Sequence, residues 1–244
     1  MDYWPIFVLT LPGDDARRAP LLSQLEGAGF SPQLFFGVDG RNGLPSDCEA
    51  LINRDGARQA LGRDMTDGEF ACALSHRAIY AKILDDGLPG AVIFEDDARL
   101  APELLDLMTM RQHQQVPMIL FHYRYGRGLA FSRKRLSPTA SMQRAVNRAT
   151  STMAYALRCD SAAVLMSHAT PVSFQADWPC DLYAAKAWLL NPRMAFEAEG
   201  NVSHLQDDRA RTVQNVPKPP RGHTFGQWVR ARFSNRVGRE RGQP

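Results

Sequence analysis

The sequence predicts an α/β protein with a mostly parallel, doubly wound sheet that is flanked by helices. Short apolar runs alternate with segments whose apolar residues recur every three to four positions, which is the order of strands and helices in a βαβ fold. The run Ala91–Phe94 is apolar throughout, as expected of a central parallel strand that is covered on both faces. Hydrophobic residues make up 44% of the 244 positions and charged residues 23%, a composition typical of globular proteins.

The first part of the chain predicts two strands with a helix between them. A strand over Ile6–Leu9 ends at Leu11-Pro12-Gly13. The helix that follows spans Arg18–Ala28 and carries Pro20 in its first turn, where proline is tolerated. The second strand spans Gln33–Val38.

A capping box marks the next helix. Residues 41–65 are polar and predict irregular structure, and Thr66-Asp67-Gly68-Glu69 then has the N-cap threonine and the glutamate three positions later that begin a helix. This helix ends at Asp86-Gly87, and the strand Ala91–Phe94 follows it. Further along the chain, we expect a helix over residues 181–190.

The N-terminal residues and the cysteines bear on the compartment. MDYWPIFVLT has an acidic residue at position 2 and no basic start, so it predicts a first strand rather than a signal peptide, and no apolar run approaches the roughly 18 residues of a membrane-spanning helix. The cysteines lack CxxC spacing, which excludes a zinc ribbon and gives no disulfide framework. We therefore expect a cytoplasmic protein, with the inner face of the cytoplasmic membrane as a further hypothesis. The four cysteines are Cys48, Cys72, Cys159 and Cys180.

Positive charge is concentrated in two segments. Residues 206–244 hold nine Lys or Arg and three acidic residues, a net +6, whereas the remainder has a net charge of −3. Between Asp106 and Asp160 there are nine basic residues and no acidic one, which fits either a solvated loop region or a surface that faces phosphates. A slightly acidic body does not suggest a general nucleic-acid binder. We expect residues 1–205 to form one domain and residues 206–244 a basic tail.

Three successive acids follow the central strand. Side chains alternate along a strand, so Glu95 and Asp97 are expected on one side and Asp96 on the other. Carboxylates at the carboxyl end of a parallel strand suit a hard divalent ion such as Mn²⁺ or Mg²⁺, which would neutralise a diphosphate leaving group. Equally, strand ends often run into acidic loops, with Asp97 capping a following helix.

The stretch from Gly68 to Leu100, GEFACALSHRAIYAKILDDGLPGAVIFEDDARL, resembles glycosyltransferase family 25, the bacterial lipopolysaccharide galactosyltransferase-like family. That family has a GE-x-G-C-x-x-SH helix followed by a strand ending in EDD. FVLTLPGDDARR, FFGVDG, TMAYALRCDSAAVLM and QADWPCD are similar to further family elements, so the resemblance covers roughly residues 5–205. Ala71 and Ala154 stand where the family pattern has glycine.

The resemblance implies a GT-A-like transferase that moves a hexose, with galactose as the first candidate, from a UDP-sugar to a lipopolysaccharide-core or related, lipid-linked glycan. An inverting single displacement assisted by Mn²⁺ or Mg²⁺ is the expected mechanism. Glu95-Asp96-Asp97 is similar to the Asp-x-Asp element, with Asp97 as the direct metal ligand. The base that takes the acceptor hydroxyl proton is Asp177, in an element similar to the family's "VD", with Asp181 in reserve. Asp181 also fits a plain acidic residue at a helix start.

The other candidates for donor or metal binding each have an ordinary explanation as well. Glu69 is explained by the capping box, while Ser75 and His76 belong to the SH pair of the resembled motif. Arg17 and Arg18 are either solvated charges or contacts to a phosphate near that helix start. The remaining two candidates are Asp39, which would accept the uracil N3–H or is a turn residue, and His204, which would close the metal site or is a polar loop residue.

Two further functions remain open from the sequence alone. One is a metal-dependent nucleotide-sugar or phosphoester hydrolase, and the other is a non-catalytic glycolipid-binding member of the fold. Residues 222–237 place apolar side chains on one face of a predicted helix that is otherwise rich in arginine. This basic amphipathic pattern predicts either peripheral contact with an anionic membrane or a helix that packs on the domain.

Overall fold

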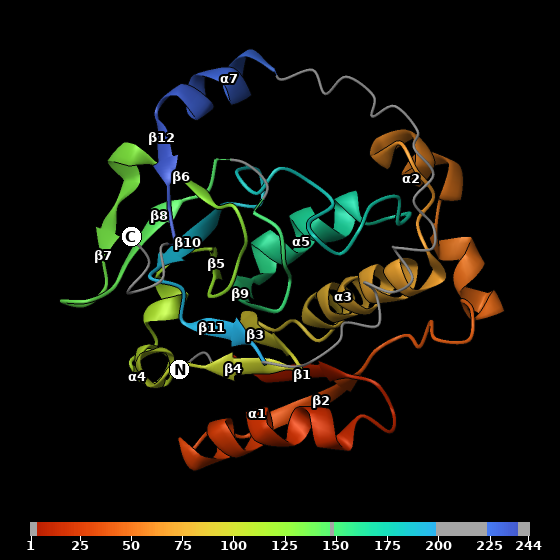
Figure 1. The fold of residues 1–244 in the computed structure, drawn as a ribbon, viewed down its shortest axis with the longest axis horizontal. Coiled ribbons are helices and arrows are strands. Elements are labelled where there is room, and N and C mark those ends of the chain that lie inside the picture. Colours follow the sequence, from red (N-terminus) through yellow and green to blue (C-terminus); the bar gives the residue numbers. More distant parts are fainter. Residues whose placement is uncertain (1–3, 147–148, 199–223, 239–244) are drawn as a thin grey trace.

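The computed structural model describes residues 4–146, 149–198 and 224–238, and its centre is an eight-stranded sheet (Figure 1). The strand order is β2-β1-β3-β9-β5-β10-β8-β7, and only β9 and β8 run opposite to the other six. The predicted α/β fold with a mostly parallel sheet is therefore confirmed. The strands are β1 (Ile6–Thr10), β2 (Pro32–Phe36), β3 (Gly90–Glu95), β5 (Met118–Leu120), β7 (Lys134–Arg135), β8 (Ser141–Arg144), β9 (Ala154–Arg158) and β10 (Ala187–Asn191).

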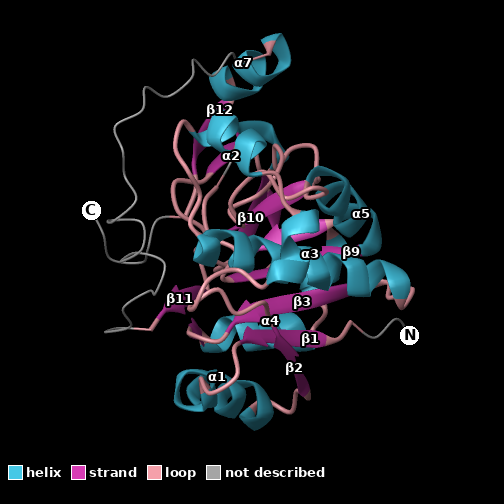
Figure 2. Ribbon diagram, turned by 90° about the vertical axis from the view of Figure 1, so that its right-hand side faces the viewer, coloured by secondary structure: helices cyan, strands magenta, loops and turns pink. Residues whose placement is uncertain are grey.

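Helices cover both faces of this sheet (Figure 2). On one face, α1 (Asp15–Gly27) and α4 (Pro102–Thr109) bury leucines against alternate side chains of β1 and β3. On the other face, α3 (Asp67–Asp85) and α5 (Cys159–His168) pack against the remaining side chains. Two-sided burial explains why β3 is apolar from Gly90 to Phe94.

The first residues of α3 form the capping box that the sequence predicts. The Thr66 hydroxyl accepts the Glu69 N–H at 3.1 Å, and the Glu69 carboxylate accepts the Thr66 N–H at 3.1 Å. These two bonds satisfy N–H groups that a helix start otherwise leaves unpaired. They also fix where α3 begins, and so which of its residues reach the end of β3.

Three local expectations are wrong. Residues 41–65 contain a 3₁₀ helix, η1 (Ser46–Leu51), and a short helix, α2 (Arg54–Leu61), that begins with Asn53 as its N-cap. No helix spans 181–190, because residues after Asp181 form turns and then enter β10. Asp97 caps no helix, since β4 (Ala98–Leu100) follows it directly and pairs with β11 (Ala195–Glu197).

The C-terminal segment folds back on the sheet instead of continuing as one helix. The helix α7 (Phe225–Arg232) stops after eight residues, and β12 (Ser234–Arg236) pairs with β6 (Arg127–Leu129). Val237 is buried in the core. A helix over all of 222–237 is therefore wrong, and the boundary expected at residue 205 lies outside the described residues. Among the described residues, no helix has the length and apolar character needed to cross a membrane.

Candidate functional site

A cleft lies beside the carboxyl ends of β1 and β3, the edge where ligands bind in open α/β sheets. Its lining comes from the end of β1 with the start of α1, the segment after β2, the first turns of α3, the acids after β3, Arg124 after β5, the loops that precede β9 and β10, and the end of β11. The predicted residues that line it are Arg17, Glu69, Ser75, Glu95, Asp96, Asp97 and Asp177.

Arg17 joins two of the three successive acids. Its Nε donates to Asp96 Oδ1 and its Nη2 donates to Asp97 Oδ2, each at 2.6 Å. Asp96 is further fixed by the Thr10 hydroxyl, which donates to its Oδ2 at 2.7 Å. The expected alternation, with Asp96 turned away from Asp97, is wrong because β3 ends at Glu95 and both aspartates lie in the turn that follows.

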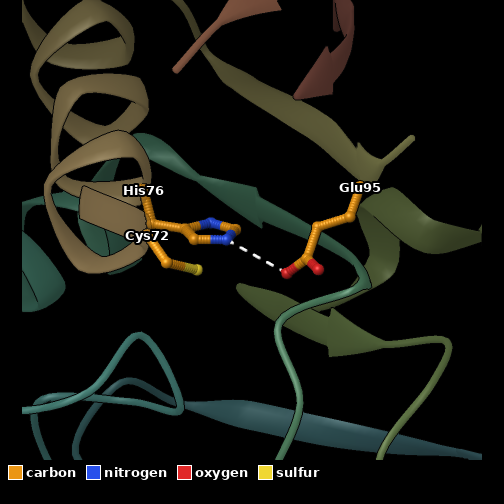
Figure 3. A group of neighbouring side chains, drawn as sticks. All are labelled: Cys72, His76 and Glu95. Atoms are coloured by element: carbon orange, nitrogen blue, oxygen red, sulfur yellow. Dashed lines mark hydrogen bonds and ion pairs between the residues drawn. The ribbon is translucent and has the colours of Figure 1, made fainter. Parts of the chain in front are cut away.

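Glu95 belongs to a second chain of hydrogen bonds, and Figure 3 shows its contact with His76. Its Oε1 lies 3.2 Å from His76 Nε2 and accepts the Thr152 hydroxyl at 2.8 Å, and His76 Nδ1 lies 2.9 Å from the Tyr155 hydroxyl. Burial opposes ionisation of Glu95, but the hydrogen bond from His76 and the positive charge of Arg17 hold its pKa below the usual range. Glu95 is thus kept as a carboxylate at the cleft.

Asp97 has the opposite electrostatic character. Burial, together with the neighbouring charge of Glu95, raises the pKa of Asp97 to about 6, against the attraction of Arg17. Its Oδ1 is buried and has no hydrogen-bond partner among the described residues. A buried carboxylate oxygen without a partner is costly, and a bound cation would remove that cost.

A group of three side chains, two of which line the cleft, could hold a metal ion. The ligand atoms of Cys72, His76 and Glu95 all lie within 4.8 Å of one another, with Cys72 and His76 one helical turn apart on α3 (Figure 3). Sulfur and imidazole ligands suit softer ions such as Zn²⁺, whereas carboxylates suit Mn²⁺ or Mg²⁺. The predicted ligands are Asp97, Glu95 and His204, of which His204 lies outside the described residues. The group with Cys72 and His76 is a second candidate ligand set, and it shares Glu95 with the predicted one.

The first turn of α3 carries a buried ion pair at the cleft. Glu69 is 1% exposed, and both its oxygens accept from Arg63, at 2.6 and 2.7 Å. Gln175 also donates to Glu69, which ties α3 to the loop that holds Asp177. Ser75, further along α3, accepts the Val38 N–H at 2.8 Å and holds the segment after β2 against the helix.

Asp177 projects from a tightly fixed loop. Its Oδ1 accepts the Ser151 N–H at 2.8 Å. The next residue, Trp178, is fully buried, donates from its indole N–H to the Ala149 carbonyl at 2.6 Å, and has a left-handed φ of 70° that non-glycine residues rarely adopt. The burial of Trp178 sets the position from which Asp177 reaches the cleft.

The other predicted residues lie beside the cleft or outside the described chain. Asp181 is not among the cleft-lining residues, and its Oδ2 accepts from Arg230 of α7 at 3.0 Å. Arg18 binds Asp15 and lies over the Phe36 ring, and Asp39 accepts a forked pair of bonds from Arg41. The predicted ligand His204 lies outside the described residues.

Sequence reasoning missed several residues that shape this site. These residues are Thr10, Thr152 and Cys72. The two threonines gave no signal, because each contacts an acid that is distant in the sequence. Cys72 could have been found most readily of the three, since it shares a helical face with His76 at a spacing of four.

Comparison with known proteins identifies the family. Residues 4–180 match the model of glycosyltransferase family 25, described as an LPS biosynthesis protein, and the chain belongs to this family. It is 36% identical over 103 residues to a rat protein named "Probable inactive glycosyltransferase 25 family member 3", and 30% identical over 129 residues to zebrafish "Procollagen galactosyltransferase 1". These matches cover 41% and 50% of this chain but only 18% and 21% of those proteins, so the chain spans about a fifth of the relatives' length.

One solved structure shows a distant similarity. It is described as mannose-1-phosphate geranyltransferase from Thermus thermophilus, and it has a TM-score of 0.35 and 8% identity over 78% of this chain and 60% of that one. This similarity is too low to support any inference about the site.

Proposed function

We propose that the protein is a hexosyltransferase that moves a hexose, with galactose as the first candidate, from a UDP-sugar to a lipopolysaccharide-core or related glycan. The observation that supports this most is the cleft in which Asp96 and Asp97, fixed by Arg17, share a wall with Glu95 while Asp177 stands on a separate loop. In this proposal the acids near Arg17 serve the donor, and Asp177 serves the acceptor from the same cleft. Membership of the family and the similarity to a procollagen galactosyltransferase support a transferase.

The chain's own residues divide the work of an inverting displacement. Arg17 holds Asp96 and Asp97 in fixed positions, so the carboxylates at the cleft are preorganised to hold a cation. Asp177, oriented by the Ser151 N–H, takes the proton from the acceptor hydroxyl as that oxygen attacks the anomeric carbon. Glu95, ionised and held by His76, completes the anionic wall.

The donor set fits a divalent ion. The partnerless Oδ1 of Asp97 and the carboxylate of Glu95 would hold it, and the ion would supply neutralisation of the diphosphate leaving group. Carboxylate oxygens favour Mn²⁺ or Mg²⁺. His204 is the residue that we propose as a third ligand.

The experiment that tests this proposal measures nucleotide release from a panel of nucleotide sugars with Mn²⁺, with and without a truncated lipopolysaccharide-core oligosaccharide. Release that requires the acceptor, with UDP-galactose as the best donor, would support a transferase. Release at the same rate without an acceptor would indicate a nucleotide-sugar hydrolase instead. Asp181→Asn serves as the control for an acid that lies outside the cleft lining.

A second candidate function is a non-catalytic, glycan-binding member of the family. Relatives described as inactive favour it. In that case UDP-sugar turnover would be absent with every donor, and Asp97→Asn would leave glycan binding unchanged.

We also infer peripheral contact with an anionic membrane at the inner face of the cytoplasmic membrane. On α7, the stacked rings of Phe225 and Trp228 are 80% and 57% exposed. A second exposed aromatic pair, Phe131 and Phe233, has ring centroids 6.4 Å apart and lies on segments next to β6 and β12. Exposed bases flank these aromatic side chains, a combination that favours an anionic interface. These bases are Arg133, Lys134, Arg135, Arg232 and Arg236.

Co-sedimentation with vesicles tests the membrane contact. The full chain should bind phosphatidylcholine vesicles that contain phosphatidylglycerol, and a Phe225→Ser/Trp228→Ser variant should bind them more weakly. Phe36→Ser, which removes an exposed aromatic residue on β2, is the matched control. Equal binding by all three proteins would overturn the inference.

A further inference from the structure

A second cavity adjoins the cleft and has residues of its own. It is lined mainly by residues near α4 and β11. Its side chains include an aromatic ring, a buried histidine and charged groups of both signs. Arg124 and Glu197 line both this cavity and the cleft, and they form an ion pair with each other. The second cavity therefore lies next to the candidate site, with one pair of half-exposed side chains between them.

The backbone couples this cavity to the acids of the cleft. The strand β4 begins directly after Asp97 and pairs with β11, with Ala98 opposite Glu197. One residue beyond β11, the Ala198 N–H donates to the Asp97 carbonyl at 3.2 Å. A ligand in the cavity would therefore lie beside the paired strands β4 and β11, which end at Asp97. In the proposed reaction, the acceptor has to approach the donor at this end.

His122 supplies a hydrogen-bond acceptor in the cavity wall. It is 5% exposed, and its Nδ1 lies 2.8 Å from the Ala195 carbonyl, which can only accept, so Nδ1 carries the proton. Its Nε2 is buried and has no partner among the described residues. Burial, with a smaller effect of Arg193, lowers the pKa of His122 and keeps the ring neutral. The unprotonated Nε2 of this neutral ring can accept a hydrogen bond from a hydroxyl group.

The remaining lining fits an uncharged sugar ring. Phe196 on β11 keeps 36% of its surface exposed and offers a flat apolar face to the C–H groups of a pyranose. The charged side chains are balanced, with Glu103 and Glu197 against Arg124 and Arg193. A balanced set gives no net attraction for a phosphate or a carboxylate, in contrast to a basic surface.

We propose that this second cavity is the acceptor subsite, which binds an uncharged pyranose of the acceptor glycan with its ring face on Phe196 and a hydroxyl on His122 Nε2. This inference rests on the proposed transferase function. It assigns an acceptor-side role to β11, while the donor occupies the cleft on the other side of the Arg124–Glu197 pair.

Binding of simple sugars tests the cavity separately from catalysis. The probes are the methyl β-pyranosides of galactose, glucose and N-acetylglucosamine, observed by ligand NMR at millimolar concentrations, with methyl β-glucuronoside as the anionic comparison. We expect at least one neutral probe to bind wild type. Phe196→Ala should weaken that binding about fivefold or more, whereas Phe196→Trp should retain it. His122→Asn, whose amide can still donate to Ala195, should weaken it as well.

Phe131→Ala, which removes another exposed ring far along the sequence from β11, is the matched control and should bind like wild type. Absence of neutral-probe binding, a preference for the glucuronoside, or equal binding by wild type and Phe196→Ala would overturn the inference. UDP binding in the presence of Mn²⁺, measured calorimetrically on the same proteins, reports on the donor site. If wild type fails to bind UDP while Phe196→Ala still loses the glycoside, the transferase proposal fails and the saccharide site stands.

Discussion

Asp177 and Asp181 are four residues apart, and the fold gives them different surroundings. Asp177 lines the cleft and accepts a backbone N–H from Ser151, a contact that orients the carboxylate. Asp181 accepts from the Tyr183 N–H and from two side chains of α7, Gln227 and Arg230. The first acid thus lies where a substrate can reach it, and the second connects the domain to its C-terminal helix.

The difference shows that the role of an acidic residue depends on the groups it contacts in the fold more than on its neighbours in the sequence. The guanidinium of Arg230 also lies over the Tyr183 ring, 4.2 Å from its centroid, so the charge of Asp181 is matched within a packed contact. These partners come from about 50 positions further along the chain. Substitutions in the two regions should therefore affect different measurements, kinetics in the cleft and stability at α7.

The largest effect is expected at Asp97. Asp97→Asn removes the carboxylate that would bind the metal while keeping the size of the side chain, and transfer should fall by about a thousandfold or more. The measurement is kcat/KM with Mn²⁺, together with a melting curve to show that the fold is retained. Near-normal turnover, or a wild type that is indifferent to EDTA, would contradict the metal assignment.

Asp177→Asn should have the next largest effect. Loss of a general base lowers kcat by roughly a hundred- to ten-thousandfold. The Asn side chain can still accept the Ser151 N–H, so donor affinity should remain close to that of wild type. UDP binding by calorimetry checks the donor side, and a collapse of that binding would show that Asp177 contacts the donor or supports the loop.

Much of the cleft wall around Arg17 and the acids after β3 could be predicted because its signals are local. The capping box fixes the start of α3, the apolar run fixes β3, and the acids after β3 follow from that strand. Chain topology then brings Arg17 to these acids. Each step uses either a short motif or the general rule that ligands bind at the carboxyl ends of parallel strands.

The region after Asp177 could not be predicted in the same way. The segment 181–190 looks helical by composition, yet β10 is required to fill the sheet between β5 and β8, and this tertiary demand overrides local propensity. The C-terminal segment likewise has a helical pattern to residue 237, but pairing of β12 with β6 and burial of Val237 end the helix early. Both errors arise from contacts between residues distant in sequence.

Two buried histidines, His76 and His113, also differ in their hydrogen-bond partners. His76 has a partner at each ring nitrogen, whereas His113 packs edge-on against Trp4 and has a buried Nδ1 without a partner among the described residues. Burial, with a smaller effect of Arg111, lowers the pKa of His113 to about 4. Since the unfolded value is about 6.5, the native state binds fewer protons between these values.

The contribution of His113 to the free energy of unfolding should therefore be complete above about pH 6.5. It should decrease by about 3 kcal/mol as the pH falls to about 4. Urea unfolding at pH 7 and pH 4.5 measures this loss. His113→Gln should reduce the pH dependence, whereas His168→Gln, at an exposed position, should not. An unchanged pH dependence in His113→Gln would show that other groups cause the acid sensitivity.

The smallest effect is expected at Asp181, and it separates the two acids most directly. Its ion pair with Arg230 is partly exposed, with 22% and 23% of the two side chains accessible, so screening limits its contribution to about 1 kcal/mol or less. Asp181→Asn should leave kcat within about twofold of wild type. The double variant with Arg230→Gln should lose less stability than the sum of the two single variants, because the two substitutions share one contact. Chemical unfolding and the transfer assay on these three proteins measure both quantities. A drop in kcat comparable to that of Asp177→Asn would place Asp181 in the reaction, and it would mean that α7 moves away from Asp181 when the acceptor binds.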